Sequence, residues 1–113
     1  MSVGRQRRYF CPVDVTLSVI DGKWKPLILC NLSAPRRFGA LQRALPRVSH
    51  KVLTQQLRAL EGTGLIRRLQ SQNAKNVTYE MTEFGRTLKP SLTALASWGR
   101  KNHKAIGVEL EWR

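Results

Sequence analysis

The fold of this chain is indicated most clearly by residues 38–62, FGALQRALPRVSHKVLTQQLRALEG. The first part of the stretch predicts a short helix from Phe38 to Leu45, with Leu41 on the same apolar side. Pro46 cannot continue that helix, because proline lacks the backbone N–H that a helix interior requires. A tight turn is therefore expected at this point.

The second part of the stretch predicts another helix, from about Ser49 to Glu61. Ser49 is a favourable N-cap residue, because its hydroxyl can accept a hydrogen bond from a backbone N–H of the first turn. Apolar residues at helical spacing give this helix one buried face, formed by Leu53, Leu57 and Leu60. Glycines follow at once and close the helix. The stretch therefore predicts a helix, a tight turn and a second helix.

The outer face of the second helix is cationic and rich in hydrogen-bond donors. Once the leucines face the core, the outer residues are Ser49, His50, Lys51, Thr54, Gln55 and Arg58. Lys and Arg pair with guanine edges or phosphates, Gln with adenine, and a Thr methyl group with thymine. A solvated amphipathic face is the alternative for this helix alone. The preceding helix, the hairpin described next and the regional charge favour a surface that reads DNA in a major groove.

After Leu65 the apolar period changes from that of a helix to that of strands. Ile66–Gln70 and Val77–Met81 are predicted to form two strands joined by residues 71–76, which makes a basic hairpin, or wing. Candidate contacts from the wing and the neighbouring backbone to phosphates or a minor groove are Arg37, Arg67, Arg68, Lys75 and Asn76. Alternatively, one arginine of the first strand pairs with Glu80 across the hairpin. Both roles can coexist.

Two helices are predicted before the central stretch. The first begins at Pro12, whose missing N–H costs nothing there, and carries an apolar stripe as far as Ile20. The second runs from Trp24 to Leu32 and is also apolar along one side. We expect both helices to form core.

A last helix is predicted after Thr82, which caps it, and its apolar side continues to Gly99. Pro90 falls inside this pattern, where a proline costs roughly 3 kcal/mol, so we expect the helix to bend there. Trp24 and Trp98 are expected in the core or in an interface, because such rings bury a large area.

The chain of 113 residues carries a formal net charge of +13, from 20 Lys and Arg against 7 Asp and Glu. Between Arg36 and Lys75, nine basic residues face a single acid, Glu61. This excess favours a polyanionic partner, although charge alone does not choose among DNA, RNA and an anionic membrane.

No apolar run approaches the roughly 20 residues that a membrane span needs, and the arginine-rich start lacks the apolar segment of a signal peptide. We therefore expect no membrane partner and a cytoplasmic protein, nucleoid-associated when bound to DNA. Its expected organisation is a basic N-terminal arm over 1–10, one domain over 11–105 and a C-terminal tail over 106–113.

Candidate metal ligands and catalytic groups are few. Cys11 and Cys30 are too few for a disulfide scaffold, and with His50 and His103 they give no spacing suited to zinc. The sequence shows no Ser/His/Asp order, no carboxylate pair and no phosphate-binding glycine loop. We expect no metal, no cofactor and no enzymatic activity, and no small-molecule ligand is predicted.

Short motifs follow one another in unbroken order between Cys11 and Gly99. They are Cys11-Pro12-Val13, Gly22-Lys23-Trp24-Lys25, Arg37-Phe38 with Leu41, Leu45-Pro46, Ser49 with Val52-Leu53-Thr54 and Leu57, Leu60-Glu61 with Gly64-Leu65-Ile66, Tyr79 with Thr82 and Gly85, and Trp98-Gly99. In these motifs the chain resembles the HxlR-type winged helix-turn-helix transcriptional regulators, relatives of the MarR type. One departure lies at Asn73-Ala74-Lys75, where wings of the family often carry a proline pair.

The resemblance implies a homodimeric bacterial repressor or activator. The first and last helices would form most of the dimer interface, and the helix that begins at Ser49 would lie in the major groove. We expect two such helices to enter successive major grooves of a pseudo-palindromic operator, about 34 Å apart. The alternative is a winged-helix module that binds RNA or another protein and carries a basic surface without operator specificity.

Cys11 precedes Pro12 at the predicted start of the first helix, near Arg7 and Arg8, a setting in which thiols become reactive. Some members of the family it resembles use a cysteine at this place to sense oxidants or electrophiles, through thiol modification or an intersubunit disulfide. The alternative is a small residue that packs at the dimer interface. Cys30, in mid-helix, is interpreted as structural.

Overall fold

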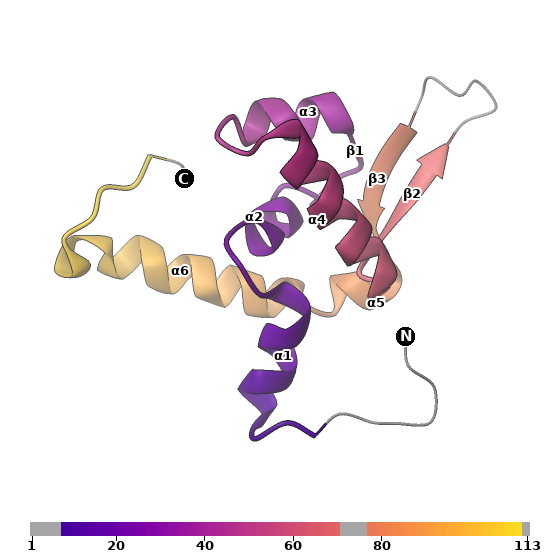
Figure 1. Cartoon of the computed structure of the whole chain (residues 1–113). Helices are drawn as coiled ribbons and strands as arrows, with labels where there is room; N and C mark the ends of the chain where they lie inside the picture. The colour runs from indigo at the N-terminus through magenta and orange to yellow at the C-terminus, as the bar shows by residue number, and fades with distance from the viewer. Residues whose placement is uncertain (1–7, 71–76, 112–113) are drawn as a thin grey trace.

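The computed structural model describes residues 8–70 and 77–111. In chain order the elements are α1 (Pro12–Ile20), α2 (Trp24–Cys30), β1 (Arg36–Arg37), α3 (Phe38–Ala44), α4 (His50–Gly62), β2 (Ile66–Gln70), β3 (Val77–Met81), α5 (Glu83–Arg86) and α6 (Lys89–Ile106). Figure 1 shows α2 and α4 at the centre, α3 above them and the small sheet on one side. The predicted class, mainly helical with a small β-hairpin, is confirmed as a winged helix-turn-helix.

The core lies between the central helices. The apolar face predicted for α4 is confirmed, because Leu53, Leu57 and Leu60 are each at most 1% exposed. They join Ile28 of α2 and Leu41 of α3 in one buried cluster. Full burial of such a side chain contributes about 1.5–3 kcal/mol, so this cluster fixes α4 against the other two helices.

The sheet contains one more strand than predicted. The expected hairpin of β2 and β3 is present, and β1 pairs with the other edge of β3, giving the antiparallel order β1-β3-β2. The predicted hairpin is therefore correct, but the expectation that it forms the whole sheet was wrong. Strand β1 consists of Arg36 and Arg37, both exposed, so it has no apolar alternation to reveal it. It forms because its backbone pairs opposite Thr78 and Tyr79.

The expected bend at Pro90 is replaced by a break between two helices. Thr82 caps the short helix α5, since its Oγ1 accepts a hydrogen bond from Gly85 N at 2.9 Å. A Cβ at Gly85 would lie 2.0 Å from Leu65 O, so only glycine permits this close approach. Pro90 lies in the first turn of the separate helix α6, where its missing N–H breaks no helical hydrogen bond.

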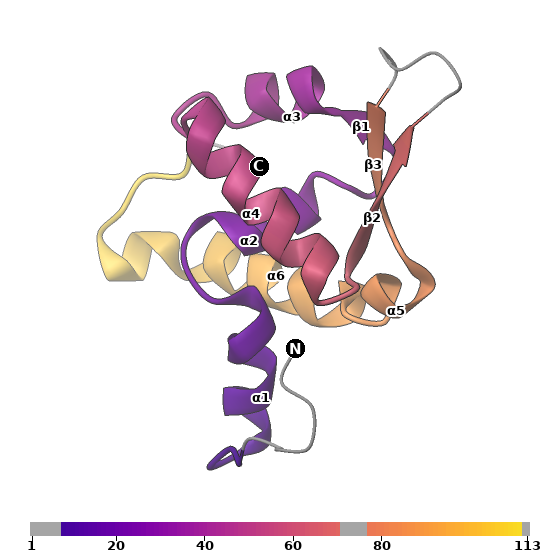
Figure 2. The same ribbon diagram turned by 45° about the vertical axis from the view of Figure 1, so that its right-hand side comes forward.

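Helices α1 and α6 contribute little to the core of the single chain. The expectation that the first two helices both form core holds for α2 only, because Ile20 is the one buried residue of α1. Leu17 of α1 is 51% exposed, and Trp98 of α6 is 61% exposed. In Figures 1 and 2, α1 projects away from the central helices. An amphipathic pattern predicts that a face is covered, but not that the same chain covers it.

Candidate nucleic-acid interface

The turn before α4 is held by side-chain hydrogen bonds. Ser49 is the N-cap, as predicted, and its side chain accepts a hydrogen bond from Val52 N at 3.1 Å. Gln42 of α3 donates from Nε2 to the carbonyl oxygen of Val48 at 2.6 Å. These contacts fix the start of α4 relative to α3, and they give Ser49 a structural role as the N-cap of α4.

The outer face of α4 carries its polar groups toward solvent. Lys51, Gln55 and Arg58 are exposed, and none of their side chains makes a hydrogen bond or ion pair with another described residue. Their donors are therefore available to a ligand along about two turns of helix.

His50 and Thr54 are more constrained than the other residues of that face. The His50 ring lies against Phe38 of α3, with ring centroids 4.6 Å apart. The hydroxyl of Thr54 donates to His50 O at 2.8 Å, so this hydroxyl has no proton left for a base. Both residues remain on the predicted face, but the hydroxyl donor of Thr54 is already used.

The two arginines of β2 lie on opposite faces of the sheet. Arg67 is opposite Glu80 and Arg68 is opposite Tyr79, and successive strand residues alternate between faces. Arg67 donates from Nε to Glu80 Oε2 at 2.5 Å, so the alternative of a cross-strand ion pair is the arrangement present. Arg68 donates to the side chain of Gln70 at 3.2 Å.

Strand β1 adds basic groups at the far edge of the sheet. Arg37 belongs to this strand and not to the hairpin, and lies opposite Thr78. Arg36, which sequence reasoning did not select, is opposite Tyr79 and therefore shares a face of the sheet with Arg68. The sequence signal that could have identified Arg36 is its position beside Arg37, directly before Phe38. Lys75 and Asn76, predicted at the wing tip, lie outside the described residues.

Cys11 is exposed and is the N-cap residue of α1. Its carbonyl oxygen accepts from Asp14 N at 2.9 Å, while its side chain makes no capping hydrogen bond. Arg7 lies outside the described residues. Cys30 is half-buried, and burial raises the pKa of its thiol, which favours the protonated form.

The part of the chain that the structure describes contains no helix long and apolar enough to cross a membrane. Within the same residues, no group of three or more His, Cys, Asp or Glu side chains is placed to hold a metal ion.

Helix α4 presents a basic face, follows a tight turn and lies beside an arginine-rich three-stranded sheet. This arrangement defines a winged helix-turn-helix protein of the transcription-regulator class. A model of the HxlR-like helix-turn-helix family matches residues 19–106. The chain belongs to this family and is a transcriptional regulator of the helix-turn-helix type.

Individual proteins similar to this chain are also named as regulators. The uncharacterized HTH-type transcriptional regulator YtcD of Bacillus subtilis (strain 168) is 44% identical over 100 residues, covering 87% of this chain and 79% of YtcD. The redox regulator HypR in its reduced form has a TM-score of 0.82 at 37% identity, covering 85% of this chain and 97% of HypR. The reduced form of the transcriptional regulator YodB from B. subtilis has a TM-score of 0.70 at 26% identity, covering 80% and 92% of the two chains.

Proposed function

We propose that this regulator binds duplex DNA in a sequence-specific manner, with α4 in the major groove. The observation that carries the proposal is the outer face of α4, where Lys51, Gln55 and Arg58 are exposed and make no contact that would occupy their donors within the described chain. The buried leucines on the opposite face hold this surface rigidly. A rigid helix that presents several donors is suited to reading base edges.

The basic residues of the sheet supply backbone contacts in this proposal. Arg36 and Arg68 share one sheet face, and Arg37 adds charge at the β1 edge. Such residues fix the register of a protein on DNA without reading its sequence. Lys75 and Asn76 at the wing tip are proposed to contact flanking phosphates or a minor groove. Arg67 contributes less, because Glu80 already neutralises it.

The active form is proposed to be a homodimer joined through α1 and α6. Val13 and Leu17 on α1, with Leu95 and Trp98 on α6, are between 51% and 63% exposed. Large apolar side chains on two such helices are typical of a surface that another protein covers. A second copy placed there would present two α4 helices to a pseudo-palindromic operator, about 34 Å apart.

Selection of bound fragments from genomic DNA, followed by titration of the selected duplex, tests the proposal. Arg58→Ala should weaken binding to the selected site by about 1–3 kcal/mol and relax its sequence preference, because a base contact is lost. The matched control is Arg86→Ala, which removes an exposed arginine from α5. Equal losses for the two variants on selected and random DNA would contradict base reading by α4. Preferential binding of structured RNA would favour the RNA-binding alternative.

Thiol oxidation at Cys11 is proposed to change the affinity for the operator. The proposal is supported by the exposure of Cys11 at the start of α1, a helix assigned above to the dimer interface. It is also supported by likeness to regulators solved in two redox conditions, namely HypR in reduced and oxidised forms and YodB in reduced and diamide-treated forms. Two Cys11 thiols from two copies would form one disulfide, giving two electrons and two protons to an oxidant such as diamide.

Operator affinity before and after diamide treatment, together with a non-reducing gel, tests this step. The wild type should change its affinity, and a covalent dimer should appear that reductant removes. Cys11→Ala should abolish both effects, and Cys30→Ala, the matched control, should retain both. An unchanged wild-type affinity after complete oxidation of Cys11 would refute the proposal.

A further inference from the structure

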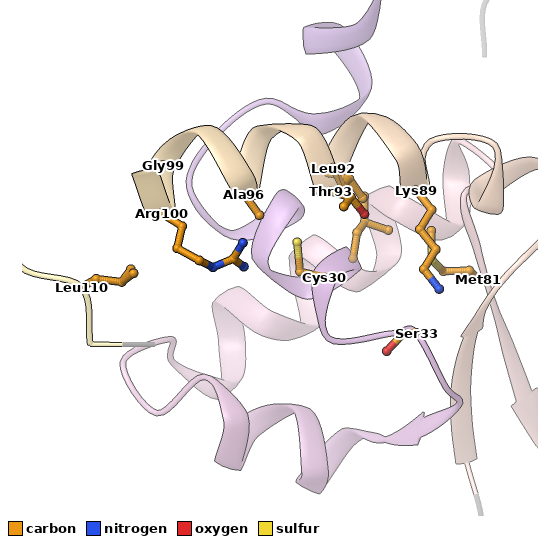
Figure 3. Close-up of a pocket in the computed structure, with 11 residues that line it drawn as sticks. Cys30, Ser33, Met81, Lys89, Leu92, Thr93, Ala96, Gly99, Arg100 and Leu110 are labelled. Atoms are coloured by element: carbon orange, nitrogen blue, oxygen red, sulfur yellow. The ribbon is translucent and has the colours of Figure 1, made fainter. Parts of the chain in front are cut away.

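A groove separates α6 from the central helices. It is bounded by α2, by the end of β3, by α6 and by the segment after α6, and it encloses about 340 Å³ (Figure 3). Its walls are mainly apolar, formed by Leu29, Met81, Leu92, Ala96 and Leu110. A volume of this size is at the lower end of the range for pockets that bind small organic molecules.

Two cationic side chains of α6 line the same groove. Arg100 follows Lys89 by about three helical turns, or about 16 Å along the axis, so both lie on one side of the helix. Figure 3 shows the Arg100 side chain extending from α6 toward Cys30, and the Lys89 side chain extending toward Met81. Neither cation pairs with a carboxylate among the residues that the structure describes.

The remaining polar residues of the groove are neutral. Cys30 and Ser33 lie on the α2 side. Burial raises the pKa of the Cys30 thiol, so it stays protonated at neutral pH and does not repel an anion. The groove therefore combines an apolar interior with two uncompensated positive charges and no lining acid.

We propose that this groove binds a small apolar carboxylic acid, with its apolar part against Leu92 and Ala96 and its carboxylate on Arg100. The planar guanidinium of Arg100 matches a carboxylate with two parallel hydrogen bonds, which the ammonium of Lys89 cannot do. Lys89 adds positive potential at the other end of the groove. Apolar walls and one convergent charged group are the usual composition of a site for such a ligand.

The groove and the proposed dimer surface occupy adjacent sides of α6. At 100° per residue, Leu92, Ala96 and Arg100 fall on one side, while Leu95 and Trp98 fall on the next. A ligand in the groove would contact α2, which packs against α4, without displacing a partner from Trp98. Any effect of the ligand on DNA rests on the function proposed above, whereas binding in the groove does not.

Calorimetric titration without DNA tests the site with two matched probes, 1-naphthylacetate and its neutral amide, 1-naphthylacetamide. The acid should bind about tenfold or more tightly than the amide, because only the acid forms the charge-assisted pair with Arg100. Arg100→Gln should abolish that preference. Lys101→Gln, which removes a neighbouring exposed charge that does not line the groove, should preserve it. Equal binding of acid and amide to the wild type, or equal losses in both variants, would overturn the proposal.

Protection of Cys30 from alkylation tests the position of the ligand independently of the calorimetric titration. In Cys11→Ala, iodoacetamide reacts with Cys30 as the one remaining cysteine, and alkaline pH is used because burial raises its thiol pKa. Saturating 1-naphthylacetate should slow alkylation severalfold in this background and have no effect once Arg100→Gln is added. Unchanged alkylation at saturation would overturn the site. Protection that rises with protein concentration and without any probe would also overturn it, because a second copy would then cover the groove.

Discussion

Helices α4 and α6 are both amphipathic, but of these two only α4 has its apolar face buried by the rest of the described chain. Its three core leucines are at most 1% exposed, whereas α6 buries Leu92 and leaves Leu95 and Trp98 about three-fifths exposed. The same apolar pattern therefore has two different outcomes in this chain. In α4 it fixes a polar face within one chain, and in α6 it leaves an exposed surface to which a second copy is proposed to bind.

Substitutions beneath α4 should reduce the stability of the fold more than any other change considered. Leu57→Ala should lower the free energy of unfolding by about 2–5 kcal/mol, because it leaves a cavity beneath α4. The matched variant is Leu95→Ala, which removes the same atoms from an exposed site on α6. Its effect should be below about 1 kcal/mol in dilute protein and should grow with concentration as dimers form. Urea unfolding at several protein concentrations measures both, and equal losses at every concentration would refute the contrast.

A smaller effect is expected on association. Trp98→Ala should weaken self-association by about 2 kcal/mol or more, roughly thirtyfold in the dissociation constant, because buried tryptophans dominate interface energies. Sedimentation equilibrium measures the change. Lys104→Ala, another exposed residue of α6, is the control and should leave association nearly unchanged. A monomeric wild type, or an unaffected dimer in Trp98→Ala, would remove Trp98 from the interface.

The sequence predicted the central region well because its signals are local. The leucine spacing of α4 and the Ser49 cap depend on neighbours within the same helix, and both are present. The outer face of α4 followed from the same geometry. The contact of His50 with Phe38, which depends on another helix, was missed, and so was the hydrogen bond of the Thr54 hydroxyl to His50 O within α4.

The features that the sequence did not predict depend on distant partners. Strand β1 exists only because β3 offers it an edge, and two exposed arginines carry no strand pattern. The apolar period predicted for the last helix runs past Pro90 without interruption, although the chain begins a new helix at Lys89. The pairing of Arg67 with Glu80 depends on register, since a shift of one residue would exchange the faces of Arg67 and Arg68.

The smallest effects compare the N-caps of α4 and α1. Ser49 accepts a hydrogen bond from Val52 N, whereas the side chain of Cys11 accepts none, so the two helix starts differ by one capping contact. Ser49→Ala should therefore cost about 1 kcal/mol of unfolding free energy. Cys11→Ser should instead give a small gain, below about 1 kcal/mol, because a hydroxyl can cap the free N–H groups of α1. Thermal unfolding under reducing conditions measures both changes.

The sign of the Cys11→Ser effect decides how the thiol is best removed. If serine stabilises α1, it alters the proposed dimer helix as well as the redox chemistry, so alanine, a poor N-cap, leaves that helix start closer to the wild type. A loss of stability in Cys11→Ser would instead mean that the thiol packs against another group, as expected for an interface residue. Because Cys11 is exposed in the single chain, that group would belong to the second copy, and the loss should then increase with protein concentration.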